Sequence, residues 1–108
     1  MMSVMKKRWT DKKIIEFAGA FREGILGERM PTMMCFAICT PLVTLANMSG
    51  IKCEMVETDL GWCNHFWLRL ADGRALDPSA DQFNYLDNAQ PPFPPVYLGP
   101  PTRWHGAV

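Results

Sequence analysis

The segment 65–77 constrains the fold of this 108-residue chain most, because its pattern predicts two strands joined by a short turn. Apolar residues recur up to Leu70, and Asp72-Gly73 supplies the turn. A two-residue turn would place Asp77 opposite Leu68, which would push a carboxylate into an apolar layer. The turn length therefore decides which side chains share a face.

A three-residue turn that closes with glycine removes this conflict. The apolar leucines then share one face of the hairpin, and His65, Trp67 and Asp77 share the other. His65 and Asp77 become diagonal neighbours, about 7–8 Å apart by backbone, a separation that their side chains can bridge. We therefore expect a loop at 71–73 and a histidine–carboxylate pair beside it.

Two helices are expected before the hairpin. Thr10 caps the first, whose apolar residues follow at helical spacing. A second apolar run, from Met33 to Met48, ends at Gly50, and we expect its helix to begin near Cys35 to Cys39 although Pro41 interrupts it. The second helix is therefore expected to be buried.

Further strands are expected at 51–57 and, as a short edge strand, at 96–98. The predicted fold class is α+β, with the N-terminal helices packed on a small antiparallel sheet. One domain is expected, with its core at 10–86 and a proline-rich surface coat at 87–108.

The composition excludes several classes of partner. Eleven basic residues balance eleven acidic ones, so we expect no nucleic-acid partner and no anionic membrane partner. No apolar stretch approaches the roughly 18 residues of a membrane span, and charges interrupt the N-terminal region, unlike an export signal. We expect a cytoplasmic protein whose four cysteines are free thiols.

Cys35 is the candidate nucleophile, because unpaired N–H groups and the dipole at a helix start favour a thiolate. A cysteine nucleophile needs a histidine base with an orienting acceptor, and His65 and Asp77 supply both. One alternative is a buried core cysteine. Another is a zinc site formed by Cys35, Cys39, Cys63 and His65, although the usual paired spacing is absent.

Three further residues have two interpretations each. Gln82 is either a donor to an oxyanion or substrate, or a surface amide. Trp67 is either a wall of the cleft or a core residue, and Trp62 would line the same cleft. His105 is expected to be a tail residue, with the alternative that the segment 103–105 folds back over the cleft.

The segment 35–50 resembles the nucleophile helix of transglutaminase-like, papain-related proteins. In that family a cysteine begins the helix, a small residue follows four positions on, and a glycine ends it. The segments 65–67 and 76–79 resemble the family's histidine–tryptophan strand and its Asp-Pro-Thr segment, with Ser79 in place of threonine. The segment 80–83 is similar to an extension in small bacterial or phage-type members. The resemblance implies catalytic residues at Cys35, His65 and Asp77.

The expected activity is that of a cysteine-dependent acyl hydrolase or acyltransferase. A thioester would form from a peptide or protein amide, an ester or a small acyl compound, and hydrolysis is favoured because water needs no second binding site. No metal or organic cofactor is expected. The alternatives are an inactive transglutaminase-like binding module that holds a peptide, and a structural zinc protein.

Overall fold

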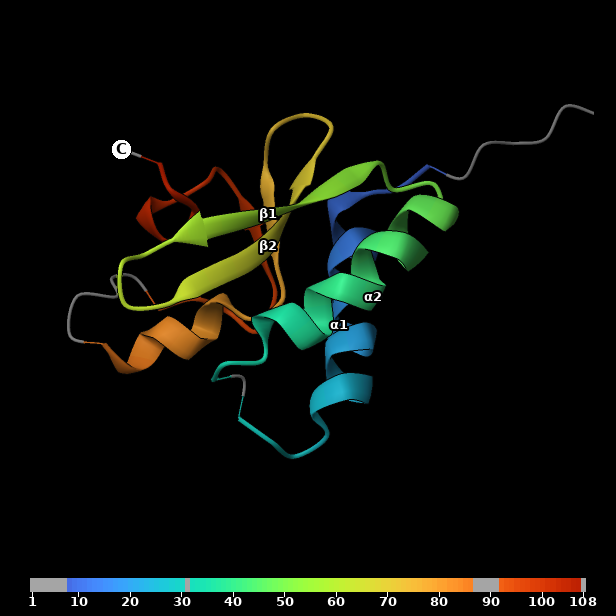
Figure 1. Cartoon of the computed structure of the whole chain (residues 1–108). Coiled ribbons are helices and arrows are strands. Elements are labelled where there is room, and N and C mark those ends of the chain that lie inside the picture. The colour runs from blue at the N-terminus through green and yellow to red at the C-terminus, as the bar shows by residue number, and fades with distance from the viewer. Residues whose placement is uncertain (1–7, 31, 87–91, 108) are drawn as a thin grey trace, which may run out of the picture.

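The computed structural model shows the first helix where the sequence predicts it. Helix α1 spans Asp11–Leu26 (Figure 1). Thr10 Oγ1 accepts a hydrogen bond from the Lys13 backbone N–H and caps the helix. Gly27 ends it at φ 57°, a left-handed conformation that favours glycine. The residues that the structure describes are 8–30, 32–86 and 92–107.

Helix α2 spans Cys35–Met48, so it begins within the predicted range 35–39, at the candidate nucleophile. The helix continues through Pro41. Ile51 N–H donates to the carbonyl oxygen of Ala46 at 2.8 Å, and Gly50, at φ 97°, makes this reversal possible. The buried residues of the helix are Cys35, Ile38, Cys39, Leu42 and Ala46.

Four strands form one antiparallel sheet in the order β1-β2-β3-β4. They are β1 Cys53–Asp59, β2 Asn64–Leu70, β3 Ala75–Asp77 and β4 Tyr97–Gly99. The first strand begins later than the predicted range 51–57, because Ile51 is used to close α2. The predicted strand at 96–98 is β4, which pairs with β3 at the edge of the sheet.

The hairpin of β2 and β3 has the predicted register. Leu68 pairs with Leu76, and Leu70 N–H donates to the carbonyl oxygen of Arg74 at 2.9 Å. Gly73 has φ 90°, as the three-residue loop requires. With this pairing, His65 and Asp77 lie on the same face of the hairpin, as predicted.

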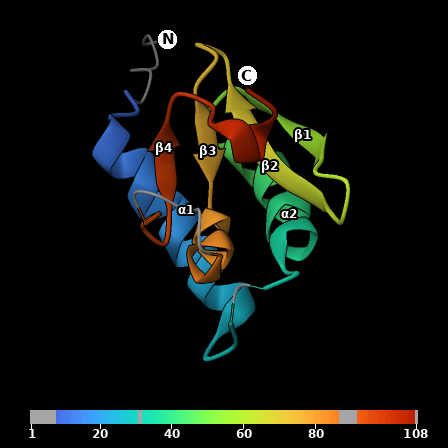
Figure 2. The ribbon, with the colours of Figure 1, turned by 90° about the vertical axis from the view of Figure 1, so that its left-hand side faces the viewer.

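Both α-helices cover one face of the sheet, and the C-terminal turn covers the other (Figure 2). This turn is the short 3-10 helix η2, Arg103–His105, which contacts β2. A second short helix, η1, Ala80–Tyr85, follows β3. The fold is thus α+β, as predicted. In the parts of the chain that the structure describes, no helix combines the length and the apolar character needed to cross a membrane.

The predicted surface coat at 87–108 needs correction. Residues 87–91 and 108 lie outside the described part of the chain. Residues 92–107 do more than cover the surface, because they supply the fourth strand and the turn η2. Trp104 and His105 in this turn are buried.

Candidate functional site

The predicted histidine–carboxylate pair is present and fully buried. His65 Nε2–H donates to Asp77 Oδ2 across 2.6 Å, and both side chains have an exposed fraction of 0%. The other carboxylate oxygen, Oδ1, accepts from the Ser79 backbone N–H at 3.0 Å. The carboxylate is therefore held at both oxygens, and it leaves His65 Nδ1 as the nitrogen available for chemistry.

A second histidine binds the same carboxylate oxygen. His105 Nε2 lies 2.7 Å from Asp77 Oδ2. Thr102 N–H donates to His105 Nδ1 at 2.9 Å, and a backbone N–H can only donate. His105 Nδ1 therefore carries no proton, Nε2 carries one, and His105 donates to Asp77.

The expectation that His105 is a tail residue is wrong. Thr102 and His105 form a capping box around η2, in which each side chain accepts a hydrogen bond from the other residue's backbone N–H. A threonine three residues before a polar acceptor is the spacing of this motif, so the sequence did contain a signal for the turn. Trp104 stacks on Phe83 with ring centroids 4.4 Å apart, which holds the turn against η1.

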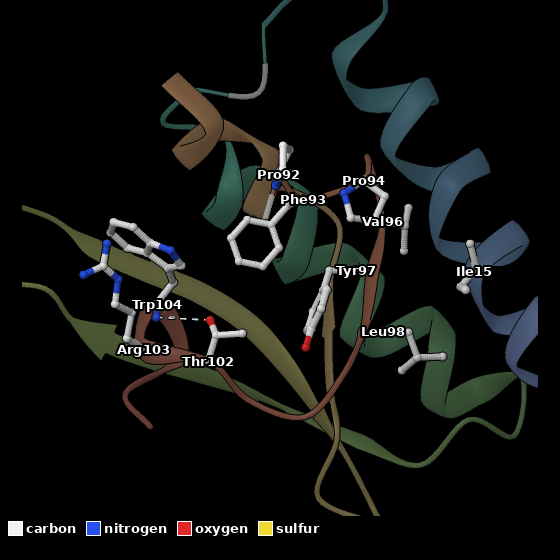
Figure 3. A pocket seen from close by; sticks show the side chains of 10 residues that line it. All are labelled: Ile15, Pro92, Phe93, Pro94, Val96, Tyr97, Leu98, Thr102, Arg103 and Trp104. Carbon is white, nitrogen blue, oxygen red and sulfur yellow. Dashed lines mark hydrogen bonds between the residues drawn. The ribbon is translucent and has the colours of Figure 1, made fainter. Parts of the chain in front are cut away.

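A hollow of about 620 Å³ lies beside this turn, between η2, β4 and α1. Figure 3 shows Tyr97 and Trp104 around it, with Thr102 Oγ1 accepting from the Trp104 backbone N–H. The lining residues include none of Cys35, His65 and Gln82. This hollow is therefore separate from the candidate site.

The buried pair shifts both pKa values. Burial acts to lower the pKa of His65, but the charge of Asp77 and its hydrogen bond outweigh burial and raise the pKa to about 9. Burial acts to raise the pKa of Asp77, but the imidazoles of His65 and His105 hold it well below the usual carboxyl range. The pair therefore favours a protonated His65 beside an ionised Asp77.

Cys35 lies at the first turn of α2, next to the start of β2. Its Sγ is 3.9 Å from the carbonyl oxygen of Asn64. Burial acts to raise the pKa of this thiol, but the hydrogen bond and charge of His65, with two backbone hydrogen bonds, lower it below the ordinary value. Burial raises the pKa of each of the other three cysteines, which are Cys39, Cys53 and Cys63.

Gln82 connects the loop before the cysteine to the histidine. Its Nε2 lies 3.4 Å from His65 Nδ1, and its Oε1 accepts from the Met33 backbone N–H at 3.2 Å. Met33 has φ 63°, a left-handed conformation that is uncommon outside glycine. Gln82 is thus next to the site and is not merely a surface amide.

The two candidate tryptophans lie in different surroundings. Trp67 is 1% exposed, packs against His105 with ring centroids 4.9 Å apart, and donates to Thr58 Oγ1. It supports the buried imidazoles and does not line a surface cleft. Trp62 is 63% exposed and remains available for binding.

Metal binding is not supported by the donors present. Cys39 Sγ contacts the carbonyl oxygen of Phe66 at 3.5 Å, and the predicted zinc ligands are not gathered in the described chain. His65, Asp77 and His105 do lie close enough to share an ion. However, His105 Nε2 carries the proton that it donates to Asp77, so this nitrogen has no lone pair for a metal.

Comparison of the chain with protein-family models, with curated proteins and with solved structures finds no match. The resemblance to transglutaminase-like proteins consequently rests on the residues of the sequence and stays a prediction. Only the residues of the site therefore indicate a function for this chain.

Proposed function

We propose that the protein is a cysteine-dependent acyl hydrolase, with Cys35 as nucleophile, His65 as acid and base, and Asp77 as the group that orients the imidazole. One observation carries the proposal. Of the four thiols, Cys35 alone has a lowered pKa, and the imidazole that lowers it is held by a buried carboxylate.

In the proposed reaction the Cys35 thiolate attacks the acyl carbon of an amide or ester and forms a carbon–sulfur bond. The protonated His65 gives its proton to the leaving amine or alcohol as that bond breaks. His65 then takes a proton from water, which attacks the thioester, and the thiolate leaves as the acid product forms. An amine in place of water would give acyl transfer.

The start of α2 supports this chemistry. Met34 is the N-cap residue, and its side chain makes no capping hydrogen bond. No side-chain cap therefore competes for the first backbone N–H groups of the helix, which can donate to the thiolate and to a developing oxyanion. The Gln82 amide, within 3.4 Å of His65 Nδ1, is a further donor close to the same position.

The test is the pH dependence of Cys35 alkylation by iodoacetamide, followed by peptide mass. We expect rapid labelling well below pH 8, and slower labelling in His65→Ala and Asp77→Asn variants. His65→Ala removes the imidazolium that favours the thiolate, and Asp77→Asn removes the carboxylate that keeps this imidazole protonated. Cys53 and Cys63 in the same molecule serve as internal controls. Labelling of Cys35 that matches these controls and ignores His65 would leave a non-catalytic binding module.

A further inference from the structure

Exposed apolar side chains are concentrated on one part of the surface. Nine large hydrophobic side chains are exposed in the described chain, and five of them line a single hollow of about 330 Å³. These five are Met30, Met33, Trp62, Tyr85 and Leu86. Such a concentration on a small protein marks a binding surface.

This hollow adjoins the proposed nucleophile. Met33 lies two residues before Cys35, and its backbone N–H is bound by Gln82. Gln82 lines the hollow and also reaches to within 3.4 Å of His65 Nδ1. A group seated in the hollow would therefore be next to the bond that the thiolate attacks.

The lining selects for uncharged groups. The remaining lining residues are Thr32, Gln82 and Phe83, so none of the described residues around the hollow carries a charge. Trp62 and Phe83 meet edge to face with centroids 6.3 Å apart, which gives the hollow an aromatic wall. A charged group would lose hydration there without gaining an opposite charge from the described lining.

We propose that this hollow is the specificity subsite, and that the substrate carries a large apolar, uncharged side chain next to the scissile acyl bond. An aromatic or branched aliphatic side chain fits its lining, and its size is at the low end for ligand sites. This inference rests on the proposed acyl hydrolase and adds the class of substrate.

The test compares three alkylating reagents at Cys35: iodoacetamide, N-benzyliodoacetamide and N-(carboxymethyl)iodoacetamide. Each rate is divided by the rate of the same reagent with glutathione, which removes differences in intrinsic reactivity. We expect the benzyl reagent to label Cys35 about tenfold faster than iodoacetamide after this correction, because a benzyl group buries apolar area. The carboxymethyl reagent should be slower than iodoacetamide.

Substitutions in the hollow test whether the preference for the benzyl reagent arises there. Tyr85→Ser and Met30→Ser should each lower the benzyl preference by about threefold, because each removes part of the apolar lining. Met48→Ser is the matched control, since Met48 is 77% exposed on α2 and does not line the hollow. It should keep the full preference.

The outcomes separate the two proposals. Fast labelling by iodoacetamide with no benzyl preference, or a preference that survives both subsite variants, overturns the apolar subsite and leaves the activated thiol standing. Slow labelling of Cys35 by iodoacetamide overturns the hydrolase, and the hollow then has no substrate to select.

Discussion

Asp77 is the residue on which the candidate site depends. Its Oδ2 accepts from two imidazoles, those of His65 and His105, and its Oδ1 accepts from Ser79. A buried carboxylate without these donors would be strongly destabilising. His105 is therefore a positioning residue: it acts on His65 through the carboxylate that they share.

We expect His105→Ala to raise the pKa of His65 above about 9, because the charge of Asp77 would then be concentrated on one imidazole. The free energy of unfolding should fall by about 2 kcal/mol with the loss of a buried hydrogen bond to a charged group. NMR titration of the His65 ring protons and urea unfolding measure these two effects.

His105→Gln is the control for this prediction, because a glutamine amide can keep an N–H donor near the position of Nε2. It should return the His65 pKa toward about 9. If His65 titrates identically in His105→Ala and in the unaltered protein, His105 does not share the charge of Asp77.

At the scale of secondary-structure elements, Arg22 on α1 anchors the segment that carries Gln82. Its guanidinium binds both carboxylate oxygens of Asp81 at 2.7 Å. It also donates to the carbonyl oxygens of Pro78 and Pro95. One side chain on α1 thus fixes η1 and the approach to β4.

Arg22→Lys should lower the free energy of unfolding by about 2 kcal/mol, because an ammonium group cannot replace the bidentate pair and both carbonyl contacts. Cys35 alkylation should also slow as η1 loosens around Gln82. Arg74→Lys is the matched control. Arg74 binds Asp11 in the same bidentate way, but this pair is exposed and should contribute little to the free energy of unfolding. Equal losses in the two variants would mean that η1 is not anchored by Arg22.

At the scale of the whole molecule, the site couples stability to pH. The pKa of His65 is raised to about 9 from an ordinary 6.5, so its contribution to stability is complete below pH 6.5 and is lost as the pH rises toward 9. The lowered pKa of Cys35 acts in the opposite sense, since its contribution grows as the pH rises. The two contributions partly cancel in the unaltered protein.

Cys35→Ala removes the thiol, so that His65 alone should determine how the stability contributed by this pair changes with pH. We expect its free energy of unfolding to fall by about 1–3 kcal/mol between pH 6.5 and 9, more steeply than that of the unaltered protein. Urea unfolding followed by tryptophan fluorescence at several pH values measures the difference, and the other cysteines cancel in the comparison. Parallel pH profiles for the two proteins would show that Cys35 and His65 do not titrate as a pair.

Local sequence determined the elements and the register of this protein. Thr10 caps α1, Gly50 allows the chain to reverse after α2, and Gly73 closes the hairpin loop. The alternation of apolar residues then placed His65 and Asp77 on one face. These features depend on neighbouring residues and on the period of two along a strand, so a single sequence carries them.

Tertiary structure alone decided what surrounds the pair. The contact of His105 with Asp77 spans 28 residues, and that of Arg22 with Asp81 spans 59. No periodicity relates residues so far apart, because their meeting depends on how η2 and α1 pack on opposite sides of the sheet. The low pKa of Cys35 likewise required α2 to begin beside His65, since burial by itself would have raised it.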